Sequence, residues 1–436
     1  MDLKNLKTIW SQASVASLQF MISNLIGKAA AACAQIYAIF VFTKMHSQSE
    51  ASIIFLLMGY AIWFQVLECG MSQTLQNRFN ARKSTAHDIR KLMVAHYSLM
   101  IILAISVAIS ATAPQLLLPE YQYDATGVEF KAFTLGSALM IIATNNVLTQ
   151  RLLLILNRGL LANALLILQS FLVIIGLLIY QQLNSPNLQV AVLLFLTPAV
   201  LVNLPIVFGL ICKIGKLSVI NRKQGGSGMI ADALRFWVLN ILAAIFIGSD
   251  YYFVAHYLNS EQIVAYHIAT RFYFFSFVAY YAYVQHQSRR LTPSALTRGG
   301  SAVNKIVRES VTIGLIFVTI VCGAAIALDE MRVFDQFTNG NGIGSFLLLS
   351  AYFYFAIRVF RDIGLVVISS AGAIHILYKV YLAEISLGLL SLYFFAKSYG
   401  GIGIFLSMAL TCLTSTTMLY YLIKKSIFVQ ERNLPQ

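Results

Sequence analysis

The chain has 436 residues, of which 58% are hydrophobic and 11% charged, and its mean hydropathy is +0.75. This composition excludes an ordinary soluble domain and predicts a polytopic membrane protein. The net charge of +14 does not indicate nucleic acid as a partner, because most basic residues lie between the apolar segments. The five cysteines show no paired spacing, so neither a disulfide framework nor a metal site nor a cofactor is expected.

Apolar runs of about 20 residues, the length that crosses a bilayer as a helix, follow one another along the chain. No small-residue cleavage pattern marks the first run as a removable signal, so we expect it to be retained. We predict an all-α integral membrane protein with about twelve spans, over residues 17–42, 51–72, 92–113, 132–155, 160–180, 189–212, 231–256, 262–286, 310–328, 344–366, 376–396 and 401–423.

The basic residues are distributed unevenly over the two sides that these spans define. Of the 31 Lys and Arg, we assign 24 to alternate loops and both termini, Arg358 and Arg361 among them, and only 4 to the opposite side. Because basic loops stay in the cytoplasm, both termini are predicted to be cytoplasmic. An anionic lipid surface is the usual partner of such charge.

The chain divides into two sets of six spans at the glycine-rich stretch 216–228, which we interpret as a cytoplasmic linker. The predicted bundles are therefore 1–215 and 229–436. A shift of 211 residues places Ser49 and Glu50 on Ser260 and Glu261 and keeps helix, outer turn and basic inner loop in phase. Six spans per repeat imply a pseudo-two-fold axis along the membrane normal. Two such bundles would enclose a central cleft, as in alternating-access transporters.

Lys28 lies in the middle of the first predicted span. A cation at a helix centre costs roughly 2.5 to 3.5 kcal/mol on insertion scales, so it is expected to face protein or a water-filled cleft. Asn24 and Gln35 share its helix face at 3.6 residues per turn. Equal distance from the following outer turn places Glu68 at the depth of Lys28, which makes Glu68 its expected counter-ion; a purely structural Lys28 remains an alternative.

A second set of polar residues surrounds the outer turn near Asn259. Asp250 is predicted to lie level with His267 and Arg271, which share a face at i and i+4. In one interpretation Asp250 and Arg271 neutralise each other as a buried pair. In the other, a proton or sodium ion on Asp250 frees Arg271 for an anionic substrate.

Four further residues are weaker candidates. Arg235, near the start of its span, is interpreted first as an interfacial cation that reaches the lipid headgroups and second as a cleft residue. Glu384 lies mid-span and is a candidate for ion coupling with no evident partner. Tyr266 and Tyr273 begin a stripe at seven-residue spacing, typical of helix packing or of an interfacial belt, although aromatic faces beside an arginine also suit a sugar next to a phosphate.

Signals for catalysis are missing from the sequence. The glycine spacing around Gly27-Lys28 and Gly215-Lys216 does not fit a nucleotide-binding loop, and the seven histidines show no metal-binding spacing. No nucleophile elbow is present either. We therefore do not expect an enzyme.

The chain resembles the multidrug/oligosaccharidyl-lipid/polysaccharide (MOP) exporter superfamily, and within it the bacterial Wzx-type O-antigen flippases. Leu67 to Arg78 (LECGMSQTLQNR) is similar to the glycine-containing end of the family's second helix. In the segment from Ser249-Asp250 to Arg271, an intramembrane acid precedes the outer turn and an Ala-x-Tyr element follows it, also as in that family. The resemblance in plan covers almost the whole chain.

The resemblance implies a bacterial inner-membrane flippase that moves an undecaprenyl-diphosphate-linked oligosaccharide from the cytoplasmic to the periplasmic leaflet. It implies a cationic cleft, matched here by Lys28 and Arg271, coupling to H+ or Na+ in some members, and the O-antigen polymerase and chain-length regulator as further partners. Rivals are a drug/cation antiporter of the same superfamily, a lipid II flippase, and a membrane enzyme of glycan assembly such as a polymerase or acyltransferase. Antiporters of cations need unpaired acids, lipid II flippases have fourteen spans, and the enzymes need a large outer loop or a catalytic histidine.

Overall fold

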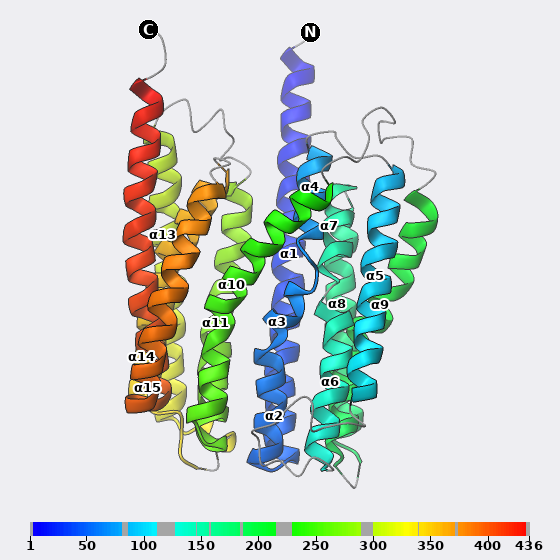
Figure 1. The fold of residues 1–436 in the computed structure, drawn as a ribbon, viewed down its shortest axis with the longest axis vertical. Coiled ribbons are helices and arrows are strands. Elements are labelled where there is room, and N and C mark those ends of the chain that lie inside the picture. The colour runs from blue at the N-terminus through cyan, green and yellow to red at the C-terminus, as the bar shows by residue number, and fades with distance from the viewer. Residues whose placement is uncertain are drawn as a thin grey trace.

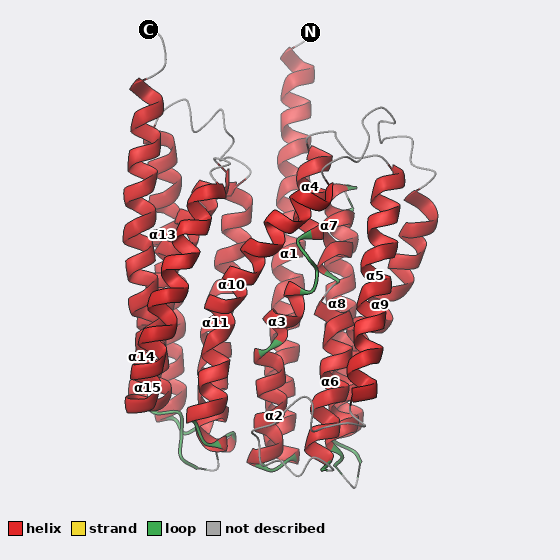
Figure 2. Cartoon of the chain, in the orientation of Figure 1, coloured by secondary structure: helices red, strands yellow, loops and turns green. Residues whose placement is uncertain are grey.

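A computed structural model describes most of the chain and contains only helices in the part it describes (Figures 1 and 2). The described residues are 3–80, 86–110, 127–144, 146–156, 158–183, 186–214, 229–288, 300–338, 340–370 and 374–432. The long helices run side by side along the long axis of the molecule, and both termini emerge at the same end (Figure 1). The expected linker 216–228 lies outside the described residues.

The helices form two groups that stand next to each other in Figure 1. The first group contains α1 (Leu3–Met45), α2 (Gln48–Gly59), α3 (Ala61–Val66), α4 (Met71–Asn80), α5 (Ala86–Ser110), α6 (Val128–Thr144), α7 (Val147–Ile155), α8 (Gly159–Tyr180) and α9 (Leu188–Ile214). The second contains α10 (Met229–Tyr257), α11 (Ser260–Ser288), α13 (Gly300–Glu330), a short 3-10 turn (Phe334–Gln336), α14 (Ser345–Ser370) and α15 (Ile374–Arg432). We call these groups the N-terminal and C-terminal halves.

The described helices account for the expected twelve crossings. Within the described ranges, nine segments are long and apolar enough to cross a membrane by length and composition. The longest of these, Ile376–Leu422, contains two crossings, because Gly400 has φ 56° and ψ −135° and interrupts the helix there. α11 and α14 are absent from the nine although they are long enough, and both carry several polar or charged residues, such as Arg271 and Arg358. The predicted fold class is confirmed.

An apolar core extends across both halves. It includes Phe42 and Phe55 from the N-terminal half and Tyr251, Phe277 and Phe355 from the C-terminal half, all buried. α11 packs against α1 and α2, and α10 packs against α2, α3 and α4. The two halves therefore meet along these six helices.

The second crossing is broken where it meets α10. The chain leaves α3 through Cys69 (φ 55°) and Gly70 (φ 68°) before α4 begins. A Cβ on Gly70 would lie 2.5 Å from the carbonyl oxygen of Ala233, so only glycine allows α10 this close. Trp237 donates its indole N–H to the carbonyl of Val66 at 2.9 Å, and the same carbonyl accepts from the backbone N–H of Cys69 at 3.1 Å, so a side chain of α10 adds a second hydrogen bond at the break. The break is thus a packed feature of the interface between the halves.

Corresponding turns of the two halves have the same cap. Ser47 and Glu50 form a reciprocal capping box at the start of α2, and Asn259 and Gln262 form one at the start of α11. These caps are 212 residues apart, one more than the shift of 211 read from the sequence. The correspondence is consistent with the proposed repeat.

We predict that Gly70→Ala destabilises the fold by about 1–3 kcal/mol or more, because the left-handed backbone is strained in any L-residue and the new methyl meets the α10 backbone. The measurement is the thermal unfolding midpoint of the purified protein in detergent. Gly209→Ala in α9 is the matched control, since a Cβ on Gly209 would have no neighbour within 4 Å. Equal midpoints for the two variants would contradict the packed break.

Candidate functional site

Arg271 on α11 reaches from the C-terminal half to the N-terminal half. Its guanidinium donates to the backbone carbonyl of Met58 on α2 at 3.1 Å and to Oε1 of Gln35 on α1 at 3.5 Å. Its Nε donates to Nε2 of His267 at 3.4 Å. All three acceptors are neutral. Arg271 therefore joins the halves without being neutralised by a carboxylate in direct contact.

A chain of hydrogen bonds connects Arg271 to Asp250. Because Nε2 of His267 accepts from Arg271, the neutral imidazole carries its proton on Nδ1 and donates it to the Tyr251 hydroxyl at 2.8 Å. The Tyr251 backbone N–H donates to Oδ1 of Asp250 at 2.8 Å, and the Tyr266 hydroxyl donates to Oδ2 at 2.9 Å. Asp250 is 7% exposed and His267 fully buried. The ring of Phe55 stacks on His267 at 4.5 Å between centroids.

The sequence predicted that Asp250 lies at the same depth in the membrane as His267 and Arg271. Asp250, His267 and Arg271 do come together, but Asp250 and Arg271 form no direct ion pair in the structure. Tyr251 and His267 separate them. The carboxylate is held by two donors of its own, and the guanidinium by neutral oxygens and a ring nitrogen. The two charges are thus linked through neutral groups and do not contact each other.

Lys28 lies half-buried on α1, inside the candidate span Ile22–Met45. It makes no hydrogen bond or ion pair with any residue that the structure describes. Gln35, which contacts Arg271, is seven residues further along α1, or about 10 Å along the helix axis. Asn24 is buried one turn from Lys28 in the other direction. One helix of the N-terminal half thus carries an unneutralised cation two turns from the residue that Arg271 contacts from the other half.

Glu68 does not act as the counter-ion of Lys28 in this structure. It is buried at the break of the second crossing, where it accepts from the backbone N–H of Ser72 at 2.6 Å. Its charge interacts with Arg151 on α7. The expectation assumed an unbroken second helix, and the turns at residues 60 and 67–70 move Glu68 away from the depth that a straight helix would give it.

The aromatic stripe is buried in the C-terminal half. Tyr266 and Tyr273 are 1% and 0% exposed, and Tyr273 donates to the carbonyl of Leu348 at 2.8 Å. Both rings also stack on neighbouring aromatic rings. Tyr273 thus makes only packing contacts and a hydrogen bond to the backbone, whereas the Tyr266 hydroxyl also holds Asp250. Arg235 is exposed in the second turn of α10, in keeping with the interfacial interpretation.

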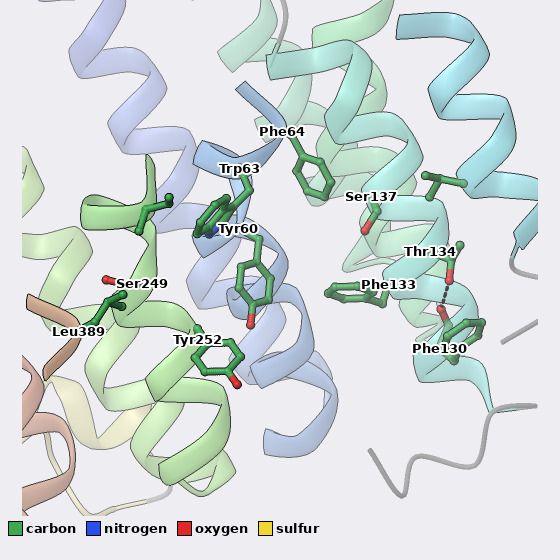
Figure 3. A pocket seen from close by; sticks show the side chains of 12 residues that line it. Tyr60, Trp63, Phe64, Phe130, Phe133, Thr134, Ser137, Ser249, Tyr252 and Leu389 are labelled. Atoms are coloured by element: carbon green, nitrogen blue, oxygen red, sulfur yellow. Dashed lines mark hydrogen bonds between the residues drawn. The ribbon is translucent and has the colours of Figure 1, made fainter. Parts of the chain in front are cut away.

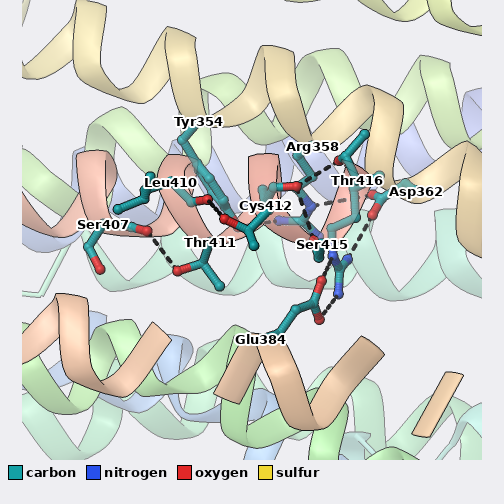
Figure 4. A network of polar contacts seen from close by, with 12 residues as sticks. Tyr354, Arg358, Asp362, Glu384, Ser407, Leu410, Thr411, Cys412, Ser415 and Thr416 are labelled. Atoms are coloured by element: carbon teal, nitrogen blue, oxygen red, sulfur yellow. Dashed lines mark hydrogen bonds and ion pairs between the residues drawn. The ribbon is translucent and has the colours of Figure 1, made fainter. Parts of the chain in front are cut away.

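Glu384 has a partner that the sequence did not reveal. Two nitrogens of Arg361 on α14, Nε and Nη2, donate to the two carboxylate oxygens of Glu384 on α15, the second at 2.7 Å. Arg361 Nη1 also donates to Asp362 at 2.9 Å, and Arg358 lies 3.4 Å from the same carboxylate (Figure 4). The Tyr281 hydroxyl on α11 donates to Asp362 as well. Two arginines and two acids thus form a balanced buried cluster that ties α11, α14 and α15 together.

Counting Arg358 and Arg361 as cytoplasmic loop charges was therefore wrong. Both lie inside α14 and face the core, where Arg358 stands 5.2 Å from the ring centroid of Phe277 and Arg361 stands 5.0 Å from that of Phe246. The sequence did contain a signal for a buried charge cluster. Arg358, Arg361 and Asp362 are spaced at i, i+3 and i+4 within the predicted span 344–366, which places them on one helix face. Ionisable residues inside a span are functional or paired by default.

The charged groups described above are suited to binding a ligand. Among the described residues, no group of three His, Cys, Asp or Glu is placed to hold a metal ion. What the interface between the halves offers is two cations without a directly bound carboxylate, Lys28 and Arg271, and one hydrogen-bonded acid, Asp250. Such groups can bind an anion and exchange a proton or small cation.

No family model matches the chain. It is 20% identical over 403 residues to a Salmonella typhi protein named "Putative O-antigen transporter", covering 89% of this chain and 91% of that one. Among solved structures it is similar to a MOP superfamily transporter from Pyrococcus furiosus, described as having a binding pocket of reverse polarity that suggests a different function (14% identity, TM-score 0.67, 95% and 96% coverage). It is also similar to a Vibrio cholerae MATE transporter (12% identity, TM-score 0.66, 96% and 98% coverage). The resemblance in fold to MOP-superfamily and MATE transporters is confirmed.

We predict that Arg361→Gln lowers the stability of the protein by about 3–5 kcal/mol, because it leaves Glu384 buried without its cation. The readout is the thermal unfolding midpoint. The double variant Arg361→Gln/Glu384→Gln should regain much of the loss, and Lys28→Gln, which breaks no ion pair, should leave the midpoint unchanged or raise it. A loss for Lys28→Gln as large as that for Arg361→Gln would show that Lys28 is a structural charge.

Proposed function

We propose that this chain, which has the fold of MOP-superfamily transporters, is an inner-membrane flippase for an undecaprenyl-diphosphate-linked oligosaccharide. The O-antigen repeat unit or a related surface glycan is the proposed cargo, moved from the cytoplasmic to the periplasmic leaflet with both termini in the cytoplasm. The support in sequence is the relative named as an O-antigen transporter, with 20% identity over most of both chains.

The proposal depends on which of the interior cations are neutralised by carboxylates and which are not. Arg358 and Arg361 are neutralised by Asp362 and Glu384, whereas Lys28 and Arg271 are in contact with no carboxylate among the described residues. Leaving a cation unneutralised at this depth is costly, so a bound anion that restores the balance would be stabilised. One such cation comes from each half. A diphosphate between the halves would meet both.

Alternating access is the proposed mechanism. Arg271 donates across the interface to Gln35 and to the Met58 carbonyl, so these hydrogen bonds must break for the halves to separate at this level. A diphosphate can replace those acceptors with charged oxygens, which bind arginine more strongly. Substrate would thereby favour the separated state, because it offers Arg271 a better partner there.

Asp250 is the proposed coupling residue. In the structure its carboxylate is satisfied by Tyr266 and the Tyr251 backbone and is connected through His267 to Arg271. Binding of a proton or sodium ion would remove its negative charge and leave Arg271 more strongly cationic toward substrate. Release of that ion would do the reverse. Glu384 is a poor candidate, since its two oxygens are occupied by Arg361.

An antiporter of cationic drugs is the second candidate, because MATE transporters share the fold. Such a site requires acids that the protein leaves unpaired. Asp250 is one acid without a cation in contact, but Asp362 and Glu384 are paired with arginines. The balance of unneutralised charge thus favours an anionic cargo.

We expect deletion of the gene from a strain that makes lipopolysaccharide to abolish the O-chain ladder on a gel. Lys28→Glu and Arg271→Glu should each fail to restore the ladder at normal protein abundance, because each replaces an attraction for the diphosphate with repulsion. Lys28→Arg, which keeps the charge, is the control. Normal ladders in the deletion strain together with increased sensitivity to cationic dyes would identify an antiporter instead.

Asp250→Asn should uncouple transport. The amide keeps the hydrogen bond from Tyr266 but cannot exchange an ion, so we expect transport in vesicles to lose its dependence on an imposed proton or sodium gradient. Glu384→Gln serves as the comparison. Because Glu384 is paired with Arg361, its substitution should lower the thermal unfolding midpoint and leave the gradient dependence of transport in place. An unchanged gradient dependence in Asp250→Asn would exclude Asp250 as the coupling group.

A further inference from the structure

A cavity of about 600 Å³ lies between the two halves, on the side where the second crossing meets α10. Its walls come from α3 and the turn before it, α5 and α6 of the N-terminal half and from α10 and α15 of the C-terminal half (Figure 3). This volume is within the range of ligand pockets. The lining is Tyr60, Trp63, Phe64, Val107, Phe130, Phe133, Thr134, Ser137, Ile245, Ser249, Tyr252 and Leu389.

The cavity is suited to hydrocarbon. Trp63 donates its N–H to the carbonyl of Gly248, and Thr134 and Ser249 donate their hydroxyls to carbonyls of their own helices. These polar groups are therefore satisfied and leave an apolar, aromatic surface. Tyr252 is 61% exposed, so this part of the wall lies at the surface of the molecule.

One polar atom in the wall has no partner. The Ser137 hydroxyl is buried and makes no hydrogen bond with any residue that the structure describes. In Figure 3 its oxygen points into the space between the aromatic side chains of the two walls. Buried polar groups are normally hydrogen-bonded, but this single hydroxyl does not change the apolar and aromatic character of the wall.

The cavity and the polar site share one turn of α10. Ser249 and Tyr252 line the cavity, while Asp250 and Tyr251 between them belong to the hydrogen-bond chain that ends at Arg271. An amphiphile with its anionic head between the halves would therefore find an apolar surface directly across α10. Lipid-linked cargo needs such a path, because its tail stays in the bilayer while its head crosses.

Resting on the function proposed above, we propose that this cavity binds the polyprenyl chain of the lipid-linked oligosaccharide while its diphosphate lies between the halves. The methyl-branched chain packs against Trp63, Phe64 and Phe133. Because both halves contribute walls, the tail site changes shape as the halves move. Tail binding and head transfer are thereby coupled.

The direct test is photo-crosslinking from within the cavity. Benzoylphenylalanine replaces Phe133 in one variant and Phe171, an exposed residue of α8, in the matched control. Both are reconstituted in phosphatidylethanolamine and phosphatidylglycerol vesicles with undecaprenyl diphosphate. We expect a polyprenyl adduct at position 133 in clear excess over position 171. Equal polyprenyl labelling at both positions, or phospholipid adducts alone at position 133, would overturn the proposal.

A functional test uses the size of residue 137. Ser137→Phe fills the cavity and should slow translocation of the lipid-linked oligosaccharide by about tenfold or more, since losing burial of about two methylene groups is worth that factor. Ser137→Ala leaves the cavity open and should transport normally. Suppose the wild-type protein and Ser137→Phe transport equally well and polyprenyl adducts form equally at positions 133 and 171. The proposed tail site is then wrong, while the proposed flippase function stands. If wild type does not move this lipid, the proposed function itself fails.

Discussion

A cation in the low-dielectric interior of a membrane protein must be neutralised, be hydrogen-bonded by neutral groups, or face water or a ligand. The chain uses all three solutions. Arg361 is fixed by Glu384 and Asp362 within the C-terminal half. Arg271 is held by neutral acceptors, two of which belong to the other half. Lys28 has no partner among the described residues. The interpretation of the site depends on this difference.

The interface between the halves combines fixed and movable contacts. At the break of the second crossing, Gly70 allows α10 to approach the backbone closely, and Trp237 donates a second hydrogen bond to the carbonyl of Val66. On the α1 side, Arg271 makes long hydrogen bonds of 3.1 and 3.5 Å to the N-terminal half. Close backbone packing is hard to rearrange, whereas an arginine can exchange one set of acceptors for another. We infer that the halves pivot about the broken crossing while the Arg271 contacts open and close.

Much of the fold could be predicted, because a bilayer imposes a length on each crossing that is visible locally in the sequence. The level of Asp250 with His267 was also predictable, since α10 and α11 are continuous helices joined by a tight turn. The same reasoning failed for Glu68. The second crossing turns at residues 60 and 67–70, and these turns depend on packing against α10, which no local pattern reveals.

The buried charge cluster was missed for a different reason. Charge asymmetry between loops is a statistical rule about topology, and applying it to Arg358 and Arg361 ignored that both lie within a predicted span. Glu384 is 23 residues from Arg361 and on another crossing, so their pairing required the packed structure. The predicted linker 216–228 lies outside the described residues and stays a prediction.

The central claim is that the interior recognises an anionic lipid-linked sugar. It is tested most directly by reconstituting the purified chain in vesicles that contain undecaprenyl-diphosphate-linked oligosaccharide and measuring how much of the sugar becomes accessible to an enzyme on the opposite side. We predict transfer well above that of empty vesicles, with strong loss in Lys28→Glu and Arg271→Glu. Transfer of a cationic dye but not of the sugar, or equal sugar transfer by the charge-reversed variants, would contradict the account.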